Sequence, residues 1–233
     1  MEKMNILELK EKSEEIREKV IRYHSETGRS HIGSSLSSIE ILTTLYYNVM
    51  NKEDRFILSK GHASSSLYVI LNDLHIIPNE KLYNLEVHPK LNSNYGIYAS
   101  TGSLGQGLSI GLGMALANKG RRIFVLLGDG ECDEGQIWEA LRDASDYNAK
   151  NLTAIVDCNG FQGFKSTNVR KLDKKFSSFG WNYSWCSGHD CKELLQRFSS
   201  PHKKPKVILA KTIKGKGIPE IENTLKSHYY HIK

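Results

Sequence analysis

Two short polar segments near the middle of the chain carry residues that can bind a metal. Gly128-Asp129-Gly130 and Asn159-Gly160 each come directly after a run of consecutive apolar residues. If those runs are neighbouring parallel strands, the Asp129 carboxylate and the Asn159 amide oxygen emerge side by side at one edge of the sheet. Both are hard oxygen ligands that suit Mg²⁺ or Ca²⁺, and Mg²⁺ also retains phosphate oxygens among its ligands. The two segments together therefore predict a site for a metal and a phosphate.

The glycines of these segments suggest how a phosphate would be bound. Gly128, Gly130 and Gly160 have no side chain, so a diphosphate could approach the backbone more closely there than beside a bulky residue. Each segment is also an ordinary turn sequence. A plain turn is the better interpretation of either segment taken alone.

The elements that must position these residues alternate along the chain. Apolar runs too short for helices predict strands at 54–59, 123–127, 152–156, 181–185 and 207–210. Helical spacing of apolar residues predicts helices at 5–26, 37–49, 62–74, 105–117, 136–147 and 192–198, and we expect a connecting loop at 82–98. This alternation is typical of an α/β fold, an open parallel sheet with helices on both faces, which binds ligands at the carboxyl ends of its strands.

The composition fits one globular domain. Of the 233 residues, 39% are hydrophobic and 25% are charged, and a chain of this size can bury a sizeable core without disulfides. We therefore expect a single domain over 1–233 with an N-terminal helical segment. No apolar run reaches the length of a membrane span, and the first twenty residues are charged rather than apolar, so we expect a cytoplasmic protein with no membrane partner.

The charge and the cysteines narrow the kind of partner. The net charge of +6 favours anionic partners, but no nucleic-acid motif is present, so a phosphorylated small molecule is the better expectation than nucleic acid. None of the four cysteines forms a CxxC pair, and all are interpreted as packing thiols. Cys186 and Cys191 flank His189 but do not complete a four-ligand metal site.

Several motifs together resemble transketolases. The segment 128–130 followed by Asn159 matches the thiamine diphosphate (ThDP) motif of enzymes that use this cofactor. Four further strings, at 30–37, 54–63, 100–109 and 210–217, are similar to the N-terminal half of transketolase in the same order, so the resemblance covers nearly the whole chain. The chain resembles in particular those transketolases that are split into two polypeptides. It would be the diphosphate-binding subunit of such an enzyme.

The resemblance implies a thiamine diphosphate-binding fold and a set of metal and cofactor ligands. Asp129, Asn159 and the backbone carbonyl of Phe161 would hold the metal, with two diphosphate oxygens and a water completing an octahedron. His62 matches a histidine that contacts the cofactor diphosphate. The backbone at Gly102 would face the aminopyrimidine.

Other matched positions concern the cofactor and the substrate channel. Leu104 would pack on the cofactor. His31, His88 and His228 match three histidines that line the channel, bind hydroxyls of the donor sugar and move protons, with His88 near the amino group of the cofactor. Each needs only a neutral imidazole near pH 7.

Some charged and polar residues have two interpretations. Glu134 matches a carboxylate that the family places at a subunit interface, but an acidic residue in the first turn also stabilises a helix. Lys211, Lys214 and Lys216 are either solvated charges or part of a loop that binds phosphate. The remaining histidines are interpreted as surface or core residues: His24, His75, His189, His202 and His231.

The activity that the resemblance implies is ketol transfer. The chain would move a two-carbon unit from a ketose phosphate to an aldose, using ThDP and Mg²⁺ or Ca²⁺. Its partners would be sugar phosphates and a second subunit carrying the pyrimidine-binding domain, in a pair of heterodimers, because the sequence ends shortly after His228. The alternatives are the alpha subunit of a 2-oxo acid dehydrogenase, which shares the ThDP motif, and a non-catalytic relative.

Overall fold

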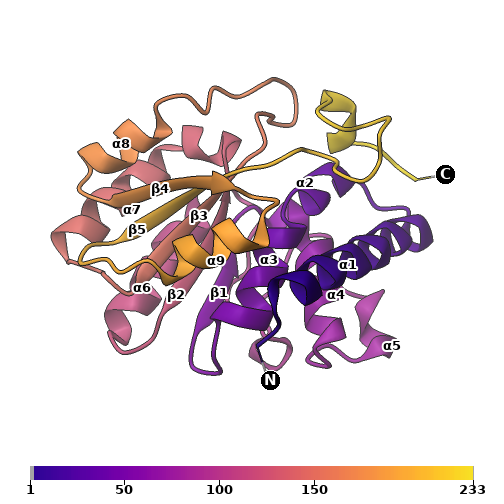
Figure 1. Ribbon diagram of the computed structural model, residues 1–233, viewed down its shortest axis with the longest axis horizontal. Helices are drawn as coiled ribbons and strands as arrows, with labels where there is room; N and C mark the ends of the chain where they lie inside the picture. The colour runs from indigo at the N-terminus through magenta and orange to yellow at the C-terminus, as the bar shows by residue number, and fades with distance from the viewer. Residues whose placement is uncertain (1–2, 233) are drawn as a thin grey trace.

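The computed structural model describes residues 3–232, so residues 1, 2 and 233 of the expected domain lie outside it. Its centre is a five-stranded sheet in the order β1-β2-β3-β5-β4, and every neighbouring pair is parallel (Figure 1). The strands are β1 (Arg55–Leu58), β2 (Ile123–Gly128), β3 (Leu152–Cys158), β4 (Asn182–Ser187) and β5 (Lys206–Lys211). All five strands predicted from apolar runs are present, and the α/β fold is confirmed.

Helices cover both faces of the sheet, because alternate side chains of each strand point to opposite faces. Phe56 and Leu58 of β1 belong to one hydrophobic cluster, and Ile57 belongs to the other. The first cluster includes residues of α1 (Ile6–Thr27), α2 (Ile32–Leu36), α3 (Ile39–Thr44), α4 (Ser64–Asp73), α5 (Asn79–Leu82) and α9 (Cys191–Ser199). The second includes residues of α6 (Gln106–Ala117), α7 (Gly135–Asp146) and α8 (Leu172–Ser178).

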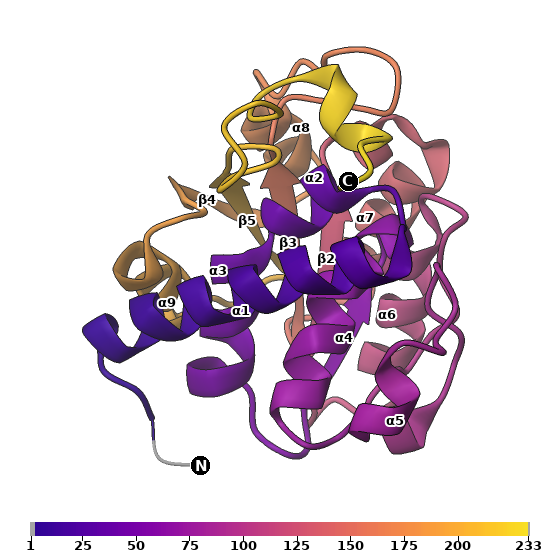
Figure 2. The same cartoon turned by 90° about the vertical axis from the view of Figure 1, so that its right-hand side faces the viewer.

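The register brings the carboxyl ends of the central strands together. Gly128 at the end of β2 is the partner of Asp157 in β3, and Asp157 is the partner of Ala210 in β5. In Figure 2 the loops that follow these strands and the C-terminal segment gather at one end of the sheet. The segments at 128–130 and 159–160 therefore lie at the same edge, as predicted.

Helix α1 shows how local sequence sets an element. The side chain of Asn5 accepts hydrogen bonds from the backbone N–H groups of Leu7 and Glu8, and the Glu8 carboxylate accepts one from Asn5 N. The helix ends at Gly28, which has a φ of +61°.

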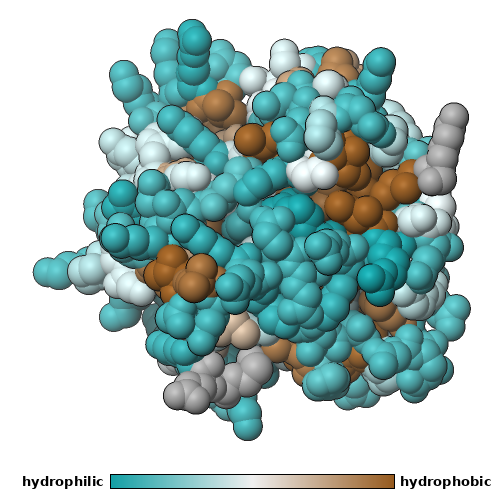
Figure 3. Space-filling view, turned by 45° about the vertical axis from the view of Figure 1, so that its right-hand side comes forward, coloured by the Kyte–Doolittle hydropathy of each residue, from teal (hydrophilic) through white to brown (hydrophobic). Residues whose placement is uncertain are grey.

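The face of the molecule in Figure 3 is mainly hydrophilic, with hydrophobic residues in scattered patches. No helix among residues 3–232 combines the length and the apolar character needed to cross a membrane.

The structure differs from the predicted elements at the helix expected at 37–49 and at three short helices that were not predicted, α2, α5 and α8. The helix expected at 37–49 begins at Ile39 instead, because Ser37 and Ser38 form a turn between α2 and α3 in which the Ser38 hydroxyl donates to the backbone carbonyl oxygen of Ser35 at 3.0 Å. That segment ends in a π-helical turn, Leu45–Val49. Helix α8 was not predicted, because only Leu172 and Phe176 of its seven residues are buried.

Candidate functional site

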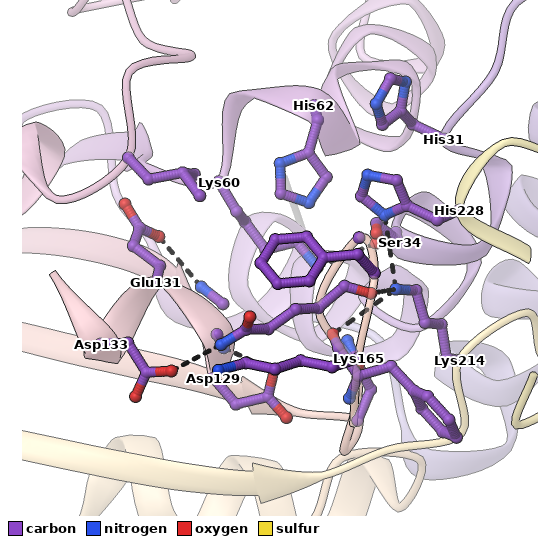
Figure 4. Close-up of a pocket in the computed structure, with 18 of the residues that line it drawn as sticks. His31, Ser34, Lys60, His62, Asp129, Glu131, Asp133, Lys165, Lys214 and His228 are labelled. Atoms are coloured by element: carbon purple, nitrogen blue, oxygen red, sulfur yellow. Dashed lines mark hydrogen bonds between the residues drawn. The ribbon is translucent and has the colours of Figure 1, made fainter. Parts of the chain in front are cut away.

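A cavity of about 490 Å³ opens at the carboxyl ends of β1, β2, β3 and β5 (Figure 4). In that view the imidazoles of His31, His62 and His228 lie toward one side, and Asp129 and Asp133 lie toward the other. All twelve site residues predicted from the sequence line this cavity: His31, His62, His88, Gly102, Leu104, Gly128, Asp129, Gly130, Glu134, Asn159, Phe161 and His228.

Asp129 and Asn159 are both nearly buried in the wall of this cavity, with exposures of 4% and 8%. The Asp129 carboxylate accepts hydrogen bonds from Gly130 N at 2.7 Å, Gly160 N at 2.6 Å and the Thr167 hydroxyl at 2.8 Å. The Asn159 Oδ1 atom accepts one from Phe161 N at 3.1 Å. These oxygens keep lone pairs for a further ligand, because a carboxylate offers about four acceptor positions and an amide oxygen two.

The donor set suits a hard cation. A carboxylate, an amide oxygen and a backbone carbonyl are typical ligands of Mg²⁺ when phosphates complete its shell. Within residues 3–232 no three His, Cys, Asp or Glu side chains cluster in a way that would hold a metal by themselves. Cys186, His189 and Cys191 accordingly do not form such a cluster. All four cysteines are buried and unpaired.

The electrostatics of the cavity also favour a cation. Burial, together with the neighbouring Asp157 carboxylate, raises the pKa of Asp129 to about 6, although hydrogen bonds to Thr167, Gly160 and Gly130 lower it. A cation beside this carboxylate would stabilise its charged form. The observed residues therefore fit a divalent metal.

Four imidazoles cluster at the other side of the cavity. The ring centroid of His31 lies 4.7 Å from that of His228, 5.7 Å from that of His62 and 6.4 Å from that of His88. Burial is the largest cause that lowers the pKa of His31 and His62, and it lowers the pKa of His228 to about 4 with help from Lys214 and His31. These three rings are therefore neutral near pH 7 and can each donate one hydrogen bond and accept another.

The C-terminal segment holds His228 against His31. The backbone N–H of His31 donates to the His228 carbonyl oxygen at 2.9 Å, and His31 adopts a φ of +70°. A Cβ atom at Gly33 would lie 2.5 Å from Ser227 Cβ, so only glycine permits this approach. The backbone thus joins two histidines that are far apart in the sequence.

The glycines of the site serve different purposes. A Cβ at Gly130 would lie 2.4 Å from Gln162 Cγ, and one at Gly102, where φ is +135°, would lie 2.9 Å from the His88 ring. At Gly130 a neighbouring side chain of the chain itself is thus a further reason for glycine. A Cβ at Gly128 would meet Lys60 only at an ordinary 3.8 Å, so no neighbour within the chain requires glycine there.

Sequence reasoning missed three charged residues. Glu131 is 2% exposed and accepts hydrogen bonds from the backbone N–H groups of Gly105 and Gly128. Lys60 lines the cavity and forms a buried ion pair with Asp157, which does not line it. A lone acid or lysine carries no sign of burial in a sequence, although the position of Asp157 inside an apolar strand run was a usable signal.

The structure places the three lysines and the glutamate that had two interpretations in different environments. Lys214 is 1% exposed, lines the cavity and donates to the carbonyl oxygen of Gln162 at 3.1 Å, whereas Lys216 pairs with Glu40 at 2.5 Å and Lys211 is exposed. Glu134 is exposed at the N-terminus of α7.

Four of the five remaining histidines form hydrogen bonds away from the cavity. His24 bonds to the Arg29 carbonyl and the Ser65 hydroxyl, and His189 bonds to Glu40 and Ile213 N. The ring nitrogens of His202 and His231 form hydrogen bonds with backbone carbonyl oxygens.

The site and fold are those of a known family. Residues 10–233 match the family described as transketolase, thiamine diphosphate binding domain. The chain is 36% identical to an apulose-4-phosphate transketolase subunit of Actinobacillus succinogenes, over 95% of this chain and 90% of that protein. It is 34% identical to the 6-deoxy-6-sulfo-D-fructose transketolase subunit SqwG of a Clostridium species, over 95% and 90% respectively.

Solved structures agree with these sequence matches. The crystal structure of transketolase from Campylobacter jejuni superposes with a TM-score of 0.86 at 30% identity, covering 97% of this chain and 40% of that one. The family model that matches is that of transketolases. The chain therefore belongs to the transketolase family, as a member of its thiamine diphosphate-binding domains.

Proposed function

We propose that this chain is the diphosphate-binding subunit of a two-chain transketolase, which moves a two-carbon ketol unit from a ketose phosphate to an aldose. The observation that carries the proposal is one cavity in which the oxygen ligands Asp129 and Asn159 face a cluster of neutral imidazoles. The chain also spans 90% of two relatives that are themselves named as single subunits of transketolases. The whole of 1–233 acts as one diphosphate-binding domain.

Asp129, Asn159 and the Phe161 carbonyl hold Mg²⁺ or Ca²⁺, and His62 binds the diphosphate with help from the glycine backbone at Gly128. When bound, ThDP supplies the electron sink that stabilises the carbanion left by carbon–carbon cleavage. His62 suits its role because burial keeps its imidazole neutral, so it can donate a hydrogen bond without adding charge.

The remaining imidazoles act on the sugar. His31 and His228 lie side by side and hold or move protons at donor-sugar oxygens, which requires neutral rings within hydrogen-bond reach of the substrate. His88, fixed against Gly102, lies near the aminopyrimidine, and Leu104 packs on the cofactor. Glu134, exposed beside the cavity, faces the subunit interface.

The partner is a second subunit that carries the pyrimidine-binding domain, in a pair of heterodimers. Helix α6 supports this, because it contains no charged residue and its outer side is built from small and apolar residues. Ser109 and Gly113 are exposed on it, Ile110 and Met114 are half-buried, and a Cβ at Gly113 would meet nothing within 4 Å. An uncharged helix face of this kind is suited to burial by another protein.

The substrates are anionic sugars. The named substrates of the two relatives carry a phosphate and a sulfonate, and the chain has a net charge of +6. A catalytic role is favoured over that of a non-catalytic relative because metal ligands and histidines are retained together in one cavity.

Titration of ThDP in the presence of Mg²⁺ tests the cofactor site. Asp129→Ala and Asn159→Ala should each abolish metal-dependent binding, because either change removes one ligand from a six-coordinate site. The parent should bind only when a divalent cation is present, and circular dichroism should show that both variants fold. Affinity within threefold of the parent in either variant would refute the assignment of the metal ligands.

A further inference from the structure

Asp157 is a buried carboxylate that lies below the cavity without lining it. Its side chain has no exposed surface, and it occupies the penultimate position of β3, two residues before Asn159. Because side chains two apart in an extended segment point the same way, Asp157 and Asn159 lie on one side of the strand. Asp157 therefore meets Asn159 but does not reach the space where a ligand would bind.

Four segments of the chain donate hydrogen bonds to this carboxylate. Its Oδ2 atom accepts from Lys60 Nζ, from the Ser37 hydroxyl at 2.6 Å and from Asn159 Nδ2 at 3.1 Å. Its Oδ1 atom accepts from the Thr212 hydroxyl. The donors come from the loops after α2, β1, β3 and β5, so Asp157 is held in one orientation from all sides.

The arrangement determines which end of the Asn159 amide faces the cavity. An ionised carboxylate only accepts hydrogen bonds, so the end of the amide beside Asp157 must be its NH₂ group. The amide oxygen then lies at the other end, where it accepts from Phe161 N at 3.1 Å. A reversed amide would place two acceptors together at Asp157 and two donors together at Phe161.

We propose that Asp157 is a positioning residue for the metal site, which holds the Asn159 amide with its oxygen toward the cation. This inference rests on the proposed role of Asn159 as a metal ligand. A reversed amide would turn an NH₂ group toward the metal and remove one oxygen ligand. Residues that orient metal ligands in this way typically contribute about 10- to 100-fold to metal affinity.

The test separates this role from the structural role of the ion pair. Asp157→Ala alone would leave the Lys60 ammonium buried without a partner, so it is made together with Lys60→Met, and Lys60→Met alone is the control. The Mg²⁺ dissociation constant is measured by calorimetry at saturating ThDP, and ligand-free thermal unfolding shows that each variant folds. The double variant should bind Mg²⁺ about 10- to 100-fold more weakly than Lys60→Met.

Two further variants show whether an acceptor is what matters. Asp157→Asn keeps an oxygen toward Lys60 and Asn159, because the ammonium group repels an NH₂ group there, and it should bind Mg²⁺ within threefold of the parent. Thr212→Val removes the donor to the opposite oxygen and should also remain within threefold. A double variant equal to Lys60→Met, or equal losses in Asp157→Asn and Thr212→Val, would overturn the inference.

If the variants do not fold, a measurement on the parent chain tests the inference instead. In a ¹⁵N spectrum, the side-chain NH₂ of Asn159, assigned with Asn159→Asp, should exchange slowly with solvent because one proton is bonded to buried Asp157. Fast exchange of both protons would contradict the inference. If the parent itself binds ThDP without any divalent cation, the proposed metal site fails instead, and the two failures are thus distinct.

Discussion

Replacing Glu131 with alanine should destabilise the fold much more than replacing its neighbour Glu134. The Glu131 carboxylate is 2% exposed and accepts from Gly105 N at 2.9 Å, Gly128 N at 3.0 Å and the Ser59 hydroxyl at 2.5 Å. The hydroxyl can rotate to another acceptor, but the two backbone N–H groups cannot. Glu131 therefore ties the loops after β1 and β2 to the start of α6.

The size of the destabilisation follows from the backbone N–H groups that Glu131→Ala leaves without an acceptor. Each buried N–H without an acceptor costs about 1–3 kcal/mol, so two give about 2–6 kcal/mol. Burial is the largest cause that raises the pKa of Glu131, so removing this carboxylate also relieves a desolvation cost. The net loss should therefore lie nearer the low end, about 2–4 kcal/mol, or about 4–16 °C in Tm for a chain of this size.

Thermal and urea unfolding of the ligand-free chain measure this effect. Glu134→Ala is the matched control, since Glu134 is exposed and an ordinary surface change stays within about 0.5 kcal/mol. Glu131→Gln should be intermediate, because its NH₂ group would face one N–H donor while its oxygen keeps the others. A Tm for Glu131→Ala within 1 °C of the parent would refute the reasoning.

The other predictions concern cofactor binding, pH and association. His62→Ala should weaken ThDP binding, while His31→Ala should lower turnover and leave ThDP affinity unchanged, and the reverse pattern would show that the roles are misassigned. Burial lowers the pKa of His24 from 6.5 to about 4, so the unfolded state binds more protons between these values. The contribution of His24 to the free energy of unfolding should therefore fall as pH is lowered from 6.5 to 4, by up to about 3 kcal/mol, and urea titrations should show a smaller pH dependence in His24→Gln than in the parent. Equal pH dependence in the parent and in His24→Gln would contradict this prediction. Ser109→Lys on the exposed side of α6 should weaken binding of the partner subunit at least about tenfold with an unchanged Tm, because Ser109 is exposed; calorimetry measures the affinity, and unchanged affinity would exclude α6 from the interface.

The sheet could be predicted because its strands are short runs of apolar residues separated by helical segments. The positions of Asp129 and Asn159 followed, since the ends of parallel strands share an edge. The turn at Ser37 and Ser38 before α3 could not be predicted from apolar spacing, because it involves a hydrogen bond from the Ser38 hydroxyl to the backbone. Helix α8 has too few buried residues to produce a periodic signal.

Site residues could be predicted only where they lie at positions that match the family motifs. All predicted site residues line one cavity, but Glu131, Lys60 and Asp157 were missed. Their importance comes from burial and from hydrogen bonds to distant segments, and the sequence gives a sign of this only for Asp157, through its position at an apolar run. The approach of His228 to His31 likewise depends on the path of the C-terminal segment past Gly33.

The central claim is that this chain supplies one part of a two-chain transketolase, and ketol transfer measured with and without the partner tests it most directly. The purified chain is assayed with ThDP, Mg²⁺ and a series of phosphorylated and sulfonated ketose donors, first alone and then with the candidate second subunit. We expect no transfer by the chain alone, because the cofactor ring would be left in water without the preorganised surroundings that its chemistry needs. We expect transfer once the partner is added. Substantial transfer by the chain alone, or none with any partner that binds it, would contradict the account.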